Sequence, residues 1–91
     1  MGSPMIKVRY DKSVDALYIP LRRGAVVERT VEVDDDRLVD FDSHDYPVGI
    51  EILGASRGVY LMDLVEPLGL EALKADFESI ERHPFKAVEY A

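Results

Sequence analysis

The chain has no cysteine, no tryptophan and only two histidines, and these absences exclude several kinds of chemistry. Without cysteine there is no thiolate nucleophile, no zinc–thiolate site and no disulfide. His44 and His83 lie 39 residues apart, and no serine stands in the glycine-flanked context of an activated nucleophile. We therefore predict no catalytic residue and no cofactor. The sequence leaves enzymatic activity open but favours a non-enzymatic role.

Long apolar runs and a signal peptide are also missing. A typical apolar run, Val59–Met62, is far shorter than the roughly 20 residues that span a bilayer. We expect a soluble, cytoplasmic protein without a membrane partner. The first four residues, 1–4, precede a second methionine, Met5, and are typical of a remnant of recombinant expression. Residues 5–91 are then expected to form a single domain.

Basic residues are few, and the acidic ones are concentrated in the middle of the chain. The net charge is -7, and the segment Glu28–Glu51 alone contains nine acids and two bases. Five bases and two acids precede it, and seven acids and four bases follow it. Nucleic-acid binding needs a clustered basic stripe, so this pattern argues against a nucleic-acid partner. It is compatible with a basic protein partner, with a cation, or with a solvated face that keeps the protein soluble.

The length of 91 residues allows one small core. A chain of this size buries only about 60–65% of the surface that its unfolded form exposes, and no disulfide is available to compensate. The predicted second strand is apolar on both faces, whereas one helix covers only one face of a sheet. We therefore expect a homodimer in which a second copy completes the core.

The residue pattern predicts an α+β fold, a small antiparallel β-meander followed by one helix. Alternation of apolar and polar residues, with β-branched side chains, indicates five strands within residues 6–53. These strands are expected at Ile6–Tyr10, Ala16–Leu21, Val26–Val33, Leu38–Asp42 and Val48–Ile52. Because Pro20 cannot donate to a strand ladder, we expect it at an edge or a bulge.

The first turn lies between two tyrosines, Tyr10 and Tyr18, and contains two carboxylates, Asp11 and Asp15. Such a cluster of hydroxyls and carboxylates could bind a small polar ligand. The simpler interpretation is that both carboxylates accept amides of the turn while the rings pack and keep their hydroxyls in water.

The period changes after residue 53. Residues 54–66 fit either a short strand or a helical piece, and periodicity does not decide between them. Apolar residues at spacings of three and four then indicate a helix over residues 67–83, which lays one stripe on the sheet. This stripe consists of Leu70, Leu73, Phe77 and Ile80. Weak alternation over residues 85–90 is compatible with a terminal strand, either within the chain or added to a partner subunit.

The acidic segment suggests two kinds of site. As a protein-interaction surface it consists of Glu32, Asp34, Asp35 and Asp36. As a site for a hard cation, in a cation-binding protein or a small metal-dependent hydrolase, it would use Asp36, Asp40, Asp42 and Asp45. Carboxylates at alternate positions begin a calcium loop, but His44 and Asp45 occupy the positions that need an oxygen ligand and a glycine. A solvated turn is the simpler interpretation.

Several separated blocks of the sequence resemble the bacterial family called domain of unknown function 2283. The resemblance covers about residues 6–57 and stops before the predicted helix. The blocks are Tyr10–Asp11, Asp15–Ile19, Val31–Asp34, Val39–Asp42, Val48–Leu53 and Ala55–Ser56. It implies a small, mostly β, prokaryotic protein of unassigned activity, and it suggests a regulatory, antitoxin-like role. It carries over no catalytic residue. The turn at residues 43–47 lacks the glycine that is frequent there, so no ligand role is carried over for it either.

Overall fold

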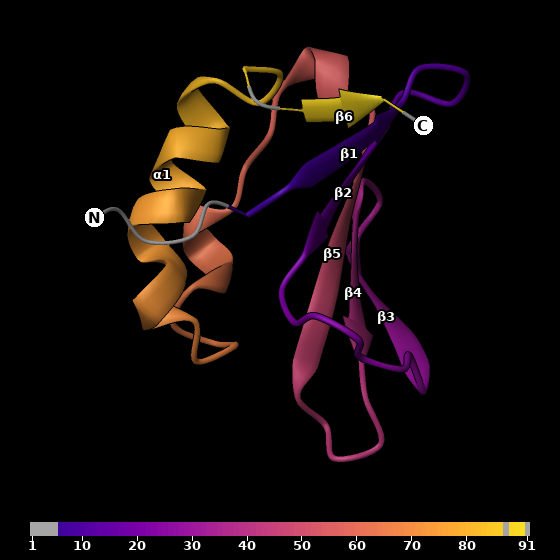
Figure 1. Ribbon diagram of the computed structural model, residues 1–91, viewed down its shortest axis with the longest axis vertical. Helices are drawn as coiled ribbons and strands as arrows, with labels where there is room; N and C mark the ends of the chain where they lie inside the picture. The colour runs from indigo at the N-terminus through magenta and orange to yellow at the C-terminus, as the bar shows by residue number, and fades with distance from the viewer. Residues whose placement is uncertain (1–5, 87, 91) are drawn as a thin grey trace.

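The structure is a computed structural model that describes residues 6–86 and 88–90. Six strands form one sheet in this part of the chain, and one α-helix and three 3-10 turns accompany it (Figure 1). The strands are β1 (Val8–Asp11), β2 (Ala16–Pro20), β3 (Arg29–Asp34), β4 (Arg37–Phe41), β5 (Pro47–Leu53) and β6 (Val88–Tyr90). The helical elements are η1 (Ala55–Arg57), η2 (Met62–Leu64), η3 (Glu71–Leu73) and α1 (Lys74–Arg82). The predicted α+β class is confirmed.

The order of the strands corrects the predicted meander. The sheet has the order β3-β4-β5-β2-β1-β6, so β2 pairs with β5 and not with the strand that follows it in sequence. Leu17 and Ile19 of β2 lie opposite Ile52 and Ile50 of β5, and all four side chains are almost fully buried. The two most apolar strands therefore occupy the centre, because pairing them there removes the most apolar surface from water.

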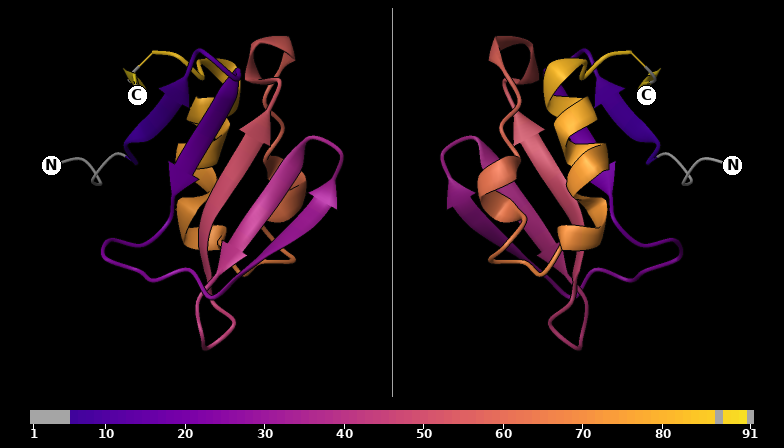
Figure 2. Two further views of the ribbon diagram at one scale, coloured as in Figure 1. Left: turned by 90° about the vertical axis from the view of Figure 1, so that its right-hand side faces the viewer. Right: turned by 90° about the vertical axis from the view of Figure 1, so that its left-hand side faces the viewer.

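The connection between β2 and β3 makes this order possible. Residues 21–28 cross the end of the sheet without regular structure, and β3 begins at Arg29 and not at Val26 as predicted (Figure 2). Pro20 is the last residue of β2 and is paired with Gly49 of β5, while on the other side β1 does not reach it. It thus stands where its missing N–H costs no ladder bond to β1.

One face of the sheet carries α1, η2 and η3, η1 follows the end of β5, and the other face is open (Figures 1 and 2). The core between the sheet and this layer contains seven side chains that are nearly inaccessible to solvent. They are Leu17, Ile19, Val39, Ile50, Ile52, Leu61 and Phe77. The predicted stripe does cover the sheet, because Phe77 and Ile80 are buried and Leu70 and Leu73 pack against the core.

The helix is shorter than predicted. It spans Lys74–Arg82 and not residues 67–83, because Gly69 has a φ of 67° and closes a separate turn. Residues 54–66, for which the periodicity leaves two alternatives, form η1 and η2, whose buried side chains extend the core. None of the helices in the described ranges has the length and apolar character that crossing a bilayer requires.

The C-terminal strand makes the sheet mixed. β6 pairs parallel with β1, in the register Val8 to Val88, whereas the other strand pairs are antiparallel. It covers the second half of the predicted segment 85–90, in which residue 87 lies outside the described residues. The prediction for residues 1–4 also falls outside them.

Candidate functional site

The outer edge of β3 is the most exposed strand surface of the described chain. β3 lies at one end of the sheet (Figure 2, left). All six of its residues are exposed. Val31 and Val33 retain 38% and 41% of their accessible surface, although both are β-branched residues typical of paired strands. Native edges are usually protected by lysine, proline or a bulge. Here β3 has a bulge between Glu32 and Asp34 but neither lysine nor proline.

The two faces of this edge differ in character. Val31 lies opposite Val39, whose side chain is buried in the core, so it faces the helix side of the sheet. Thr30 and Glu32 alternate with it and therefore face the open side. Opposite Thr30 lies Asp40, which accepts a hydrogen bond of 2.6 Å from the threonine hydroxyl. The helix side of β3 therefore presents Val31 next to Arg29, whose guanidinium stacks on Phe41, and the open side is acidic.

The predicted interaction residues follow the strand into the β3–β4 turn. Asp34 accepts a hydrogen bond from the amide of Asp36 (3.0 Å) and one from Nε of Arg37 (2.9 Å). The Arg37 bond, with the amide bond of Asp36 second, lowers the pKa of the Asp34 carboxyl. Asp36 lies 3.6 Å from the guanidinium of Arg57. The structure thus brings Glu32, Asp34 and the turn acids together along one edge, with Asp34 committed to the fold.

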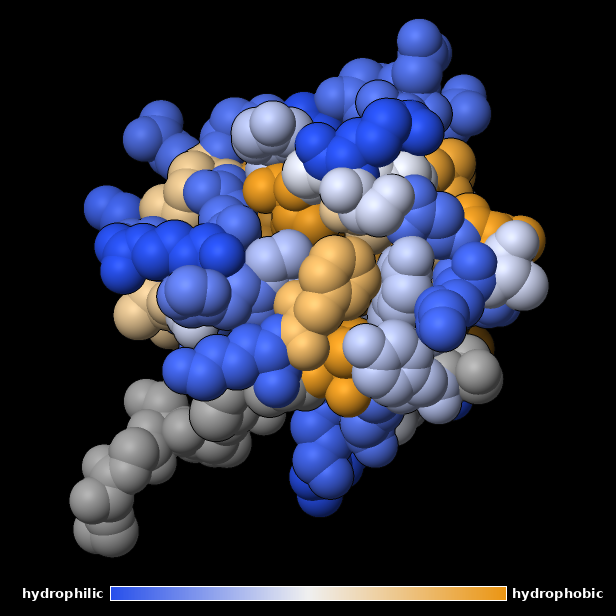
Figure 3. Space-filling model, turned by 90° about the horizontal axis from the view of Figure 1, so that it is seen from above, coloured by the Kyte–Doolittle hydropathy of each residue, from blue (hydrophilic) through white to orange (hydrophobic). Residues whose placement is uncertain are grey.

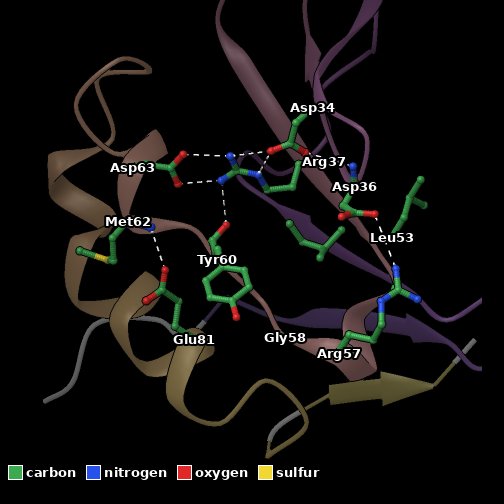
Figure 4. A pocket seen from close by; sticks show the side chains of 12 residues that line it. Asp34, Asp36, Arg37, Leu53, Arg57, Gly58, Tyr60, Met62, Asp63 and Glu81 are labelled. Carbon is green, nitrogen blue, oxygen red and sulfur yellow. Dashed lines mark hydrogen bonds and ion pairs between the residues drawn. The ribbon is translucent and has the colours of Figure 1, made fainter.

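A cleft of about 620 Å³ opens beside this turn, between the ends of β4 and β5 and the helical layer (Figure 4). Arg37 lies at its centre and donates to both carboxylate oxygens of Asp63, at 2.6 and 2.9 Å, and to the carbonyl of Tyr60 at 3.1 Å. The bonds to Asp63 raise the pKa of Arg37 and lower that of Asp63. On the opposite wall Glu81 accepts the amides of Leu61 and Met62.

Most charged side chains of the cleft bind one another or the backbone. Its lining contains no serine, threonine, cysteine or histidine, so a hydroxyl or thiol nucleophile paired with a histidine base is absent from it. Arg37 has its donors directed at three acceptors within the protein, and it joins β4 to η2. The bonds of Arg37 therefore hold the helical layer on the sheet next to the acidic edge.

The four carboxylates considered for a cation do not converge. Asp36 faces Arg57, Asp40 is held by Thr30 and Tyr18, and Asp45 pairs with Arg29 at 3.0 Å. Asp42 accepts the amides of residues 44 and 46, which closes the β4–β5 turn and lowers the pKa of its carboxyl. Within residues 6–86 and 88–90, no group of three or more histidine, cysteine or acidic side chains is placed to hold a metal ion.

Tyr18 and Asp40 form a hydrogen-bonded contact on the open face of the sheet. The ring of Tyr18 lies against Gly49, where any added Cβ would overlap the phenol, and its hydroxyl donates to Asp40 at 3.2 Å. Burial, and then the Asp40 carboxylate, raise the pKa of Tyr18 to about 12.

We expect this tyrosine to contribute to alkaline unfolding. The folded state favours the neutral phenol, so its stabilisation is complete below the unfolded value of about 10 and is lost as the pH rises towards 12. The Tm of the wild type should fall as the pH rises from 9 to 11.5. The Tm of Tyr18→Phe should fall less steeply over the same range, and that of Asp40→Asn should show an intermediate slope. An unchanged slope in Tyr18→Phe would refute this assignment.

A second polar cluster, larger than the sequence indicates, ties the first hairpin to η1. Asp15, with a φ of 52°, accepts the hydroxyls of Tyr10 and Ser56, each at 2.6 Å, and the amide of Ser56 at 3.0 Å. The Ser56 and Tyr10 bonds lower the pKa of the Asp15 carboxyl. The expectation of bonds within the turn is correct for Asp11, which accepts the amide of Ser13. It is wrong for Asp15, which accepts the amide of Ser56, 41 residues further along the chain.

The same end of the molecule carries an aromatic hollow. Tyr10 packs edge-on against Phe85 and Tyr90, with ring centroids 4.8 and 5.9 Å apart. Together with Lys12 and Ser56 these rings line a hollow of about 590 Å³. Seen from this end, hydrophobic side chains lie among hydrophilic ones, in the middle of the view and at one side of it (Figure 3). Tyr10 and Tyr18 flank the first turn as predicted, but they point to opposite faces of the sheet because Tyr10 lies opposite Leu17.

Comparison with known proteins supports the resemblance found in the sequence. The model of the family described as "Protein of unknown function (DUF2283)" matches residues 7–56. The chain belongs to this family. The DUF2283 match includes β1–β5 and the beginning of η1, so the strand edge, the β3–β4 turn and the Asp15 cluster lie inside it. The helix α1 and β6 lie outside.

A curated relative of this DUF2283 protein carries no assigned activity. "Uncharacterized protein MJ0789" of Methanocaldococcus jannaschii is 42% identical over 52 residues, which is 57% of this chain and 43% of the relative. The chain thus matches less than half the length of that protein. No solved structure matches the DUF2283 chain.

Proposed function

We propose that this DUF2283 protein is a non-enzymatic binding module that regulates a basic protein partner by pairing with it along the β3 edge. The exposed β3 strand is the observation that carries the proposal. An unpaired edge offers a row of backbone donors and acceptors, and an extended segment of another chain satisfies them by adding a strand. Two exposed valines on that strand add apolar area to bury.

Charge supports a basic partner. Glu28, Glu32 and Asp35 are exposed along the edge and its turn, and Arg29, the base among them, pairs with Asp45 and stacks on Phe41. Carboxylates around an apolar strip attract a basic chain at long range and repel an acidic one. An antitoxin-like role is one form of such regulation, in which the module holds its partner in an inactive complex.

A second copy is proposed to cover the open face of the sheet. In the described chain no element covers that face (Figure 1). It presents Leu53, 36% exposed, and, two residues back along β5, the neighbours of Glu51, Tyr18 and Leu38. Face-to-face packing of two copies would bury these side chains if Glu51, which lies between Tyr18 and Leu38, meets a base of the other copy such as Arg9, which lies opposite Tyr18 on the same face. Both β3 edges would then stay available. The module would then present two partner sites.

The proposal is tested by capture from the host lysate with the full chain, whose mass is first measured by light scattering. We expect twice 10.3 kDa, and one basic protein retained in equimolar amount with cross-links to β3. The triple variant Glu28→Gln/Glu32→Gln/Asp35→Asn should lose that protein because its attractive charges are removed.

A matched control variant has the same net charge as the β3 triple variant. Glu66→Gln/Glu71→Gln/Glu89→Gln removes three exposed acids away from β3 and should retain the partner. Equal retention by the two triple variants, or cross-links only to other surfaces, would contradict the β3 assignment. A mass of 10.3 kDa would contradict the second copy alone.

A further inference from the structure

The geometry points to the kind of segment that β3 accepts: an extended stretch in which apolar and basic residues alternate. This inference rests on the proposed function and specifies its partner. It starts from the two-sidedness of the edge. A strand added to β3 must project its own side chains alternately to the helix side and to the open side of the sheet.

The helix side of the edge selects apolar side chains. There Val31 lies beside buried Val39 and keeps 38% of its accessible surface, on a strand that has no neighbour on its outer side in the described chain. The neighbouring cation, Arg29, already has partners in the protein. Its guanidinium carbon lies 4.4 Å from the ring centroid of Phe41, and the group pairs with Asp45. A valine or isoleucine of the added strand would bury apolar surface here, whereas a charged residue would lose hydration without a partner.

The open side selects cations. Glu32 of β3, Asp40 of β4 and Glu51 of β5 all project to this side, as the pairing of Glu32 and Glu51 with Leu38 and the Asp40–Tyr18 bond show. Lysine or arginine at alternate positions of an added strand would stand next to Glu32. Cross-strand pairs of opposite charge stabilise a sheet, and like charges destabilise it.

The same rule disfavours a second copy of β3 as the occupant. Antiparallel self-pairing centred on Thr30 places Glu28 of one copy opposite Glu32 of the other, twice. Centring on Val31 brings Glu28 of one copy to the bulge at Asp34 of the other, again twice. Because both of these registers oppose carboxylates, the edge is suited to a different chain.

Two synthetic peptides of equal composition, both acetylated and amidated, test the pattern against the full-length, isotope-labelled protein at low salt. The alternating peptide consists of four lysine–valine repeats, and the block peptide has four lysines followed by four valines. We expect the alternating peptide to shift the amide signals of residues 28–34 and to bind about three- to tenfold more tightly than the block peptide. A peptide of four glutamate–valine repeats should not bind.

Protein variants provide the second arm. Glu32→Lys should weaken the binding of the alternating peptide about three- to tenfold. Glu66→Lys, an equal change of charge on another surface, should leave the affinity unchanged. Equal binding of the two lysine peptides, or shifts centred away from β3, would overturn the inference. If the capture experiment still shows a basic partner on β3, the proposed function stands without the alternating pattern; if both experiments fail, both proposals fall.

Discussion

Phe77→Ala is expected to lower the free energy of unfolding by about 3–5 kcal/mol. Phe77 is fully buried and is the largest of the core side chains, and it joins α1 to the central strands. Its removal leaves a cavity that the sheet cannot close, because β2 and β5 are held by pairing on both sides. A domain of this size has a total stability of roughly 5–15 kcal/mol, so the variant should be close to unfolded at 37 °C.

Urea unfolding followed by circular dichroism measures this effect. Val26→Ala, at a side chain that is 76% exposed, is the matched truncation and should change stability by less than about 0.5 kcal/mol. A loss below about 1 kcal/mol in Phe77→Ala would mean that α1 does not close the core, and that the covered face of the sheet is completed in another way.

Arg37→Met is expected to destabilise the protein by about 1–2 kcal/mol at neutral pH. The change removes the guanidinium of a side chain that is 13% exposed, and with it the bonds to Asp63, Asp34 and the Tyr60 carbonyl (Figure 4). The Asp63 bond joins β4 to η2, and the Tyr60 bond joins β4 to the segment before η2. The loss stays modest because both carboxylates are about half exposed, and water replaces part of the interaction.

The pH dependence of this difference identifies its cause. The pKa values of Asp63 and Asp34 are lowered by Arg37, so their stabilisation is present above the unfolded value of about 3.9 and is lost as the pH falls through the folded values. The free energies of unfolding of the wild type and of Arg37→Met should therefore converge as the pH falls from 4 to 2. Arg82→Met removes an exposed pair at 3.9 Å and should have little effect at any pH. A constant difference down to pH 2 would assign the effect to packing.

The strands themselves were predictable, because alternation is a local property. The segments 38–42 and 48–52 differ from β4 and β5 by one residue at each end. Their order was not predictable in this way, because the pairing of β2 with β5 depends on which apolar faces meet across some 30 residues of chain. The helix start was missed because Gly69 adopts a left-handed conformation that periodicity does not register.

The candidate site was predictable in part. The acidic charge of residues 28–51 pointed to the segment that forms β3 and its turn, which we propose as an interaction surface, but it did not show that Asp34 is committed to Arg37 or that Asp42 closes its own turn. The Asp15 cluster joins residues from three blocks of the family resemblance, Tyr10, Asp15 and Ser56. Those blocks were the available signal for it, but sequence spacing alone does not show that they meet.

Amide hydrogen exchange, resolved by residue, tests the pairing at β3 most directly. In the free protein, the amides of β3 that point away from β4 should exchange rapidly, because no strand of the described chain covers that edge. In complex with the alternating lysine–valine peptide, or with the captured basic partner, we expect these amides to become protected while those of β6 keep their rates. Protection that appears elsewhere and leaves the outer amides of β3 unchanged would contradict strand addition at this edge.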